Sequence, residues 1–223
     1  MIKYAKVINE ETGLCEVGVG TNTEFYKSIG MTLLDVQQSD IDGAWYLTEK
    51  CPMKTDEQKE QEERERLDKL SMTRGDVFEA LILAKGLGKA QIRSMIEQAE
   101  LDTVTKALYL NRFDEALEFY RGYPIFDMLG EALGITGAML DRFFETKDYH
   151  YLSKYTLEVH PTPSEAVITI NGEITNKITL PYNTEVEYTA SLDNYVTQTG
   201  KLNLAENKVI EIELQPETPI TQE

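Results

Sequence analysis

Tyr155-Thr156-Leu157-Glu158-Val159-His160 opens a part of the chain in which apolar and polar side chains alternate. The same alternation recurs at 166–170, 177–180, 184–190, 195–202 and 208–214. Successive side chains of a strand point to opposite faces of a sheet, so this pattern is typical of half-buried strands. Turn-forming residues such as Asn171-Gly172 separate the segments at short intervals. The sequence therefore predicts a small β-sandwich over residues 153–216.

Residues 71–152 have the helical period instead. Thr73-Arg74-Gly75-Asp76 resembles a helix-capping sequence, and Gly86 ends the apolar stripe that follows it. Apolar residues then repeat at helical spacing in segments separated by glycines, at 92–99, 104–113, 116–120, 125–133 and 139–144. We expect a bundle of short helices whose aromatic residues form its core.

The segments at the two ends differ from both of these parts. Residues 1–53 are expected to form a small β-rich unit with a hairpin around 9–13, a short helix at 23–31 and a strand at 44–47. Residues 54–70 are almost all charged or amide-bearing, which predicts a solvated spacer helix. Residues 217–223 are expected to be a flexible tail. The predicted fold class is α+β and multidomain.

Composition excludes several classes of function. The chain has 223 residues, 22 Lys plus Arg against 39 Asp plus Glu, and a net charge of −17. Such a surface repels phosphates and anionic lipids, so we expect neither a nucleic-acid partner nor membrane insertion. We find no apolar run long enough to span a bilayer and no signal-peptide core, and we expect synthesis in a cytoplasm.

No pattern of reactive residues predicts catalysis. Cys15 and Cys51 are too few for a disulfide framework or a structural zinc site and are expected to be reduced thiols. His150 and His160 lie near the predicted helix-to-sheet junction without a metal-binding spacing, which favours polar junction residues. We therefore predict no enzyme activity, no catalytic residue, no cofactor and no metal.

Five aromatic residues are the candidate binding residues. Trp45 and Tyr46 belong to a unit with little room to bury both, so we expect them at a partner interface. Tyr182, Tyr188 and Tyr195 belong to the predicted sandwich. These three could stack on a sugar or anchor a protein, or one could be core and the others cross-strand neighbours.

The sandwich segment resembles PEGA-type and related immunoglobulin-like modules. The resemblance covers about the last 65 residues. It is carried by the strand, turn and strand pattern that follows Pro163-Ser164-Glu165-Ala166, by Leu180-Pro181-Tyr182-Asn183-Thr184, and by Tyr195 after the last turn. The namesake motif is degraded to Pro-Ser-Glu-Ala here. The resemblance implies an Ig-like adhesion or spacer module without catalysis of its own.

The remainder resembles bacteriophage tail-fibre, tail-fibre-assembly and neighbouring virion proteins. Gly43-Ala44-Trp45-Tyr46-Leu47, Cys51-Pro52 and the charged helix carry this resemblance, as do Thr73-Arg74-Gly75-Asp76 and Leu140-Asp141-Arg142-Phe143-Phe144. It implies a structural protein of the tail, baseplate or fibre region, located in the virion and made in the bacterial host cytoplasm. Its expected partners are other virion proteins in a symmetric or multicopy assembly, together with a host-surface glycan or protein. The alternatives are a non-virion assembly chaperone and a capsid-decorating head protein.

Overall fold

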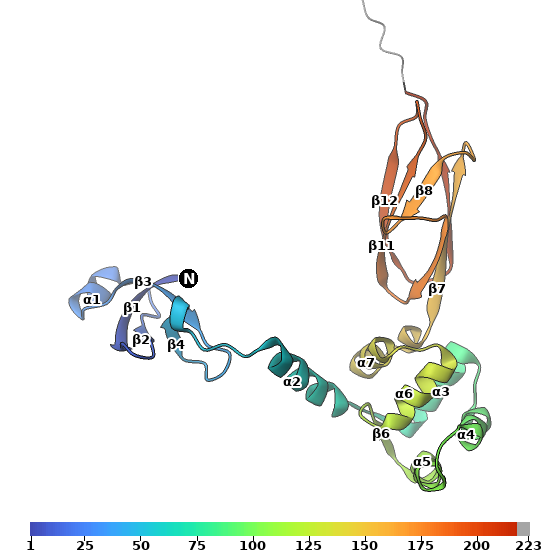
Figure 1. The fold of residues 1–223 in the computed structure, drawn as a ribbon, viewed down its shortest axis with the longest axis horizontal. Coiled ribbons are helices and arrows are strands. Elements are labelled where there is room, and N and C mark those ends of the chain that lie inside the picture. Colours follow the sequence, from blue (N-terminus) through green and yellow to red (C-terminus); the bar gives the residue numbers. More distant parts are fainter. Residues whose placement is uncertain (218–223) are drawn as a thin grey trace, which may run out of the picture. The chain divides into compact units, whose positions relative to one another are not determined.

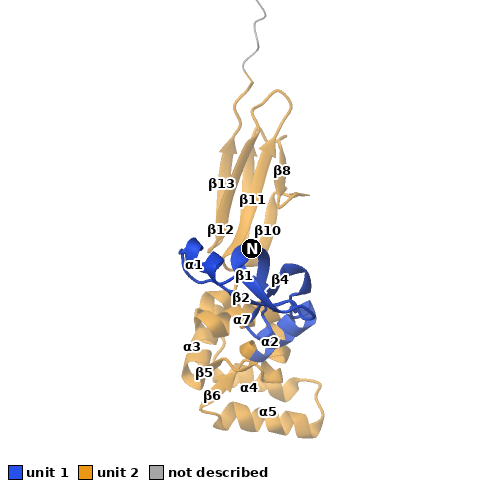
Figure 2. Cartoon of the chain, turned by 90° about the vertical axis from the view of Figure 1, so that its left-hand side faces the viewer, with its two compact units in different colours: residues 1–65 blue, residues 66–223 orange. Residues whose placement is uncertain are grey.

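The chain has an α+β fold, which the computed structural model describes for residues 1–217 (Figure 1). The chain divides into two compact units, Met1–Glu65 and Arg66–Glu223 (Figure 2). The structure describes the second unit as far as Glu217. Within residues 1–217 no helix is long and apolar enough to cross a membrane. The finer division of the chain into five segments stays a prediction.

The first unit is built on a closed four-stranded barrel in the order β1-β2-β4-β3. Its elements are β1 (Ile2–Asn9), β2 (Leu14–Val17), α1 (Thr23–Ser28), β3 (Thr32–Gln38), β4 (Trp45–Leu47) and the 3-10 turn η1 (Thr48–Lys50). The predicted β1–β2 hairpin is confirmed, and Gly13 supplies the positive φ of its turn. Strand β3 was not predicted, although it closes the barrel by pairing with both β1 and β4.

The charged segment forms the predicted helix, α2 (Asp56–Asp68), in which no residue is buried. Thr55 and Gln58 cap its start reciprocally. The Gln58 amide donates to Thr55 Oγ1 across 3.2 Å, and the Thr55 amide donates to Gln58 Oε1 across 3.0 Å. A helix that is polar on every side gains its stability from such local bonds rather than from a packed face.

The second unit begins with a helical part held by a two-stranded ribbon. Its elements are β5 (Ser71–Thr73), α3 (Arg74–Lys85), α4 (Lys89–Gln98), α5 (Thr103–Glu115), β6 (Glu118–Tyr120), α6 (Pro124–Leu133), α7 (Gly137–Thr146) and the 3-10 turn η2 (Tyr149–Leu152). The predicted cap of α3 is confirmed, since Thr73 Oγ1 accepts from the Asp76 amide and Gly86 adopts a left-handed C-cap.

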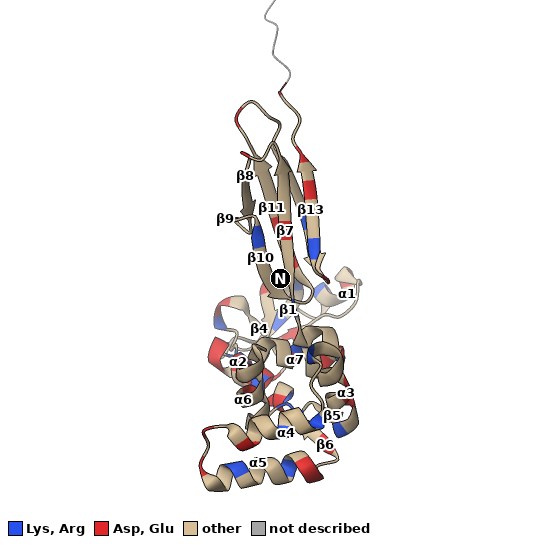
Figure 3. Ribbon diagram, turned by 90° about the vertical axis from the view of Figure 1, so that its right-hand side faces the viewer, with Lys and Arg blue, Asp and Glu red and all other residues tan. Residues whose placement is uncertain are grey.

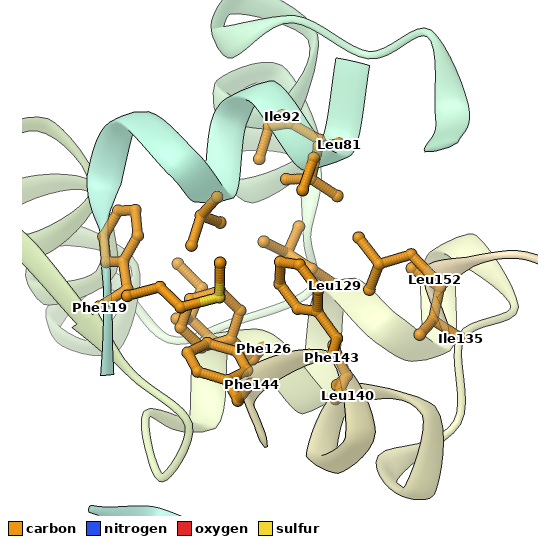
Figure 4. Packing of buried hydrophobic residues seen from close by; sticks show 14 of the residues in the cluster. Leu81, Ile92, Phe119, Phe126, Leu129, Ile135, Leu140, Phe143, Phe144 and Leu152 are labelled. Carbon is orange, nitrogen blue, oxygen red and sulfur yellow. The ribbon is translucent and has the colours of Figure 1, made fainter. Parts of the chain in front are cut away.

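The prediction of a helix at 116–120 is wrong. Residues Glu118–Tyr120 form β6, which pairs antiparallel with β5. The apolar spacing there arises because Phe119 is the inward residue of a short strand and is 3% exposed. It packs edge-on against Phe126, which in turn packs edge-on against Phe144 (Figure 4). These aromatic residues form the core, as predicted.

The C-terminal part consists of two sheets that enclose a common core. Its strands are β7 (Lys154–Thr162), β8 (Val167–Ile170), β9 (Glu173–Ile174), β10 (Lys177–Pro181), β11 (Thr184–Ser191), β12 (Gln198–Leu204) and β13 (Lys208–Glu213). One sheet has the order β10-β7-β13 and the other β12-β11-β8-β9. Leu157, Ile170 and Leu204 are among the fully buried residues contributed by both sheets. Strand β13 pairs parallel with β7 over six residue pairs, from Lys208 with Leu157 to Glu213 with Thr162.

Glu217, the first residue of the predicted tail 217–223, is held by the sandwich, so the prediction of a flexible tail is wrong for this residue. Pro216 forms an antiparallel bridge with Tyr195, and the Glu217 amide donates to the Asn194 carbonyl across 2.8 Å. The other residues of the predicted tail, 218–223, lie outside the described part of the chain.

Candidate functional site

Trp45 and Tyr46, the two predicted interface residues of the first unit, are both half-buried on β4. Trp45 packs against the barrel core, and Lys3 Nζ lies 4.4 Å from the centre of its ring. Tyr46 donates to Asp42 Oδ2 across 2.7 Å, which lowers the pKa of Asp42 and raises that of Tyr46. Each residue therefore has a partner within its own unit and keeps part of its ring accessible.

Other apolar residues of the first unit are more exposed than these two. The buried barrel core consists of three small or medium side chains, Ala5, Cys15 and Val36. In contrast, Ile2 on β1 and Leu33 on β3 are 71% and 60% exposed. Further exposed apolar residues of the unit are Ile8, Val19, Phe25 and Ile29. Sequence reasoning missed the exposure of Ile2 and Leu33, because it depends on which face of β1 and β3 turns outward.

Tyr182 lies where the helical part meets the sandwich, in a group of rings that we call the joint cluster: Tyr149, His150, Tyr151, Tyr155 and Tyr182. The Tyr182 ring stacks on His150 with a centroid distance of 5.1 Å. The rings of Tyr151 and Tyr155 meet it edge-on. The Tyr182 amide also donates to the Ser153 carbonyl across 3.2 Å. Aromatic contacts and a backbone bond thus fix the β10–β11 turn against η2.

Asp148 sets the position of His150 in the joint cluster. Asp148 Oδ1 lies 2.6 Å from His150 Nδ1 and accepts from the His150 amide across 3.0 Å. Burial raises the pKa of the Asp148 carboxyl, but these two hydrogen bonds outweigh it and hold the pKa below its usual value. The interpretation of His150 as a polar residue at the junction fits this arrangement.

The other two predicted tyrosines lie at separate places in the sandwich. Tyr188 on β11 packs against the core and covers Gly200, its register partner on β12. Tyr195 packs against the same core beside its bridge to Pro216. The cross-strand interpretation therefore describes Tyr188. Within the second unit, the structure does not bring the three predicted tyrosines together into one surface.

The remaining histidine and the two thiols have local structural partners. His160 lies on the outer face of the β10-β7-β13 sheet, with Nδ1 3.0 Å from Glu211 Oε1 and Nε2 3.7 Å from Glu158 Oε2. Cys15 is buried and donates to the Gly13 carbonyl, and burial raises the pKa of its thiol. In the described part of the chain no group of three or more His, Cys, Asp or Glu residues is placed to hold a metal ion.

A buried arginine is the charged residue that sequence reasoning missed. Arg121, one residue after β6, is 1% exposed. Its Nε donates to Asp141 on α7, and its Nη1 lies 3.0 Å from Asp127 on α6, without a hydrogen bond to it. Nη2 reaches the Gly137 carbonyl at 3.4 Å. These partners lie 6 to 20 residues away in the sequence, so no local pattern identifies them, and their role is to tie β6, α6 and α7 together.

Figure 3 marks the positions of the charged residues along the ribbon. Lys and Arg are interspersed there with Asp and Glu on α4, α5 and β13.

The comparison with known protein families, with characterised proteins and with solved structures finds no match to this chain.

Proposed function

We propose that the protein is a non-enzymatic structural adaptor of a macromolecular particle, and that this particle is a bacteriophage virion. In this proposal residues 1–53 dock onto other virion proteins in the tail, baseplate or fibre region. The charged helix and the helical bundle are the adaptor, and the two-sheet sandwich is an Ig-like module. Binding occurs through aliphatic and aromatic side chains in a repeated, symmetric interface, and multiple copies raise its strength.

One observation carries the docking part of this proposal: large aliphatic side chains on two paired strands of the first unit, β1 and β3, are exposed. The barrel core of this unit is Ala5, Cys15 and Val36, whereas Ile2 and Leu33 are more than half exposed. Covering one large aliphatic side chain contributes about 1.5–3 kcal/mol. A unit of this size sits at the margin of independent stability, so a partner that covers these residues stabilises it as well.

The helix α2 supports the adaptor part of the proposal. It has no buried residue, so it needs no packing partner of its own. In this proposal it acts as a solvated spacer between the docking unit and the helical bundle. The virion context itself rests on the sequence resemblance at Gly43-Ala44-Trp45-Tyr46-Leu47 and in the helical part.

Mass spectrometry of gradient-purified particles from the parent phage tests the proposal. We expect this chain at a fixed ratio to the major capsid protein, a low ratio indicating the tail or neck. A high ratio would indicate decoration of the head. Its presence in infected cells but not in particles would contradict the proposal and support an assembly chaperone.

A charge substitution on the exposed surface tests where docking occurs. In phage that carry Leu33→Glu we expect incorporation of this chain into particles to fall, because a charge on the docking surface must lose its water. Ile174→Glu, on an 81% exposed residue of β9, is the matched control and leaves incorporation unchanged. Equal incorporation of wild type and Leu33→Glu would show that this surface does not dock.

A further inference from the structure

A groove of about 250 Å³ lies beside the joint cluster, between α7 and the β10–β11 turn. Met139 on α7 is buried at its base, and Tyr151, Tyr182 and Asn183 line its other side. The volume is below the roughly 300–1,000 Å³ of sites for drug-sized ligands. A groove of this volume has room for a ligand about the size of a single six-membered ring.

Two aromatic rings, nearly perpendicular to each other, form walls of this groove. The rings of Tyr151 and Tyr182 are 5.0 Å apart and nearly perpendicular, at 83°. The Asn183 amide donates to the Leu204 carbonyl across 2.8 Å, so the turn that carries Tyr182 is held from two sides. Aromatic surfaces accept the apolar C–H face of a sugar ring, and a wall that is already ordered lowers the entropy cost of binding.

A cation lies at the edge of the same groove. The Arg142 guanidinium is above the Tyr151 ring at 5.5 Å, and its side chain is 56% exposed. Arg142 Nη1 lies 3.0 Å from Glu145 Oε2, and Arg142 is the cationic residue that lines this groove. A guanidinium has five N–H donors in a planar fork that fits a carboxylate.

Neutral hydrogen-bonding groups complete the groove. Asn183 has a left-handed backbone, with φ of 60°, and its exposed side-chain amide lies 3.5 Å from the Tyr151 hydroxyl. The Thr184 hydroxyl lines the groove next to it and donates to the Pro181 carbonyl. Amide and hydroxyl groups of this kind can pair with the hydroxyls of a sugar.

We propose that this groove binds one acidic sugar unit, a pyranose ring that carries a carboxylate. The ring packs in the corner of Tyr151 and Tyr182, and Arg142 pairs with the carboxylate. Asn183 and Thr184 contact the ring hydroxyls. The inference is independent of the virion proposal, because particle composition and sugar binding are measured separately and can fail separately.

Titration of the full chain with two matched probes tests this inference. Methyl β-D-glucuronide carries the carboxylate, and methyl β-D-glucoside has a hydroxymethyl group in its place. By saturation-transfer NMR we expect the glucuronide to bind with a dissociation constant on the order of 1 mM and the glucoside at least about tenfold more weakly. Equal binding of the two probes, or no binding of the glucuronide at tens of millimolar, would overturn the inference.

Matched variants locate the site. Arg142→Gln is expected to weaken glucuronide binding about tenfold or more. Arg112→Gln is the control, since Arg112 lies over the Tyr123 ring at 4.0 Å, away from the groove, and it leaves binding unchanged. Asn183→Asp adds a negative charge at a left-handed position that Asp tolerates, and it also weakens binding. Wild-type affinity in Arg142→Gln and Asn183→Asp would place the sugar elsewhere.

Discussion

The guanidinium Nε of Arg121 donates to Asp141 Oδ1 across 2.7 Å, and the Arg121 side chain is 1% exposed. Truncating Arg121 removes this ion pair and leaves a cavity where a large buried side chain was packed. We expect Arg121→Ala to lower the free energy of unfolding of the second unit by about 3 kcal/mol or more, measured by urea denaturation followed by circular dichroism at 222 nm.

The two carboxylates that face Arg121 provide a graded control. The Asp141 side chain is 21% exposed and that of Asp127 is 53% exposed. We expect Asp141→Asn to cost clearly more stability than Asp127→Asn, because water screens the more exposed pair. Equal losses in the two variants would contradict a dominant Arg121–Asp141 bond.

Gly130 is expected to be needed because there is no room for a side chain at this position, and not because of its backbone conformation. A Cβ atom at Gly130 in α6 would lie 2.8 Å from the Ile135 carbonyl oxygen, which is backbone and cannot turn away. We therefore expect Gly130→Ala to lower the thermal midpoint, although alanine is the better helix former. Gly75→Ala, in the first turn of α3, would meet only Thr73 Oγ1 at 3.7 Å and is the control that is expected not to lower the thermal midpoint.

The two compact units are expected to unfold in separate transitions. Trp45 is the single tryptophan and lies in the first unit, whose barrel core is small, whereas the helices that dominate the signal at 222 nm lie mostly in the second. We expect the Trp45 fluorescence to change at a lower urea concentration than the circular dichroism. Val36→Ala shifts only the fluorescence transition, by about 2 kcal/mol. Coincident transitions would show that the units unfold together.

The joint cluster is expected to lose stability in acid. The Asp148 pKa is lower in the folded state than in the unfolded chain, where it is about 3.9. This carboxylate therefore contributes stability above about pH 4, and the contribution is lost as the pH falls through the lower folded pKa. Between pH 5 and pH 2.5 we expect the thermal midpoint of Asp148→Asn to fall less than that of wild type, and an equal fall in the two proteins would contradict this role of Asp148.

The two thiols are expected to react at different rates. Cys15 is buried and Cys51 is partly exposed. Burial raises the pKa of both thiols, and the charges of Asp40 and Asp42 raise that of Cys51 further. With a thiol reagent at pH 8 we expect Cys51 to react first, and Cys15 only when the barrel opens. Comparing Cys15→Ser with Cys51→Ser assigns the two phases, and a fast phase that disappears in Cys15→Ser would contradict this order.

The sequence predicted the elements that depend on local patterns. The alternation from Tyr155 onward identifies most strands of the sandwich, and Thr73 and Gly86 mark the two ends of α3. The strand β6 was mistaken for a helix because a single inward residue, Phe119, fits either period, and its strand form depends on pairing with β5 far away in the chain.

Long-range relationships account for what the sequence did not predict. The ion pairs of Arg121 and the stacking of Tyr182 on His150 join residues that no spacing rule connects. For the candidate site, the aromatic residues could be named, but the contacts of Tyr182 with His150, Tyr151 and Tyr155 could not. The groove beside Arg142 was not predicted, because its lining residues come from α7, from η2 and from the β10–β11 turn.

The parallel pairing of β7 with β13 determines how the sandwich responds to mechanical force. The chain enters at the start of β7 and leaves at the end of β13, and these two points lie at opposite ends of the same six-residue ladder. Tension applied along the chain through these points pulls the strands past each other in shear. All the hydrogen bonds of the ladder then resist together, whereas an antiparallel pair pulled from its open end would unzip one bond at a time.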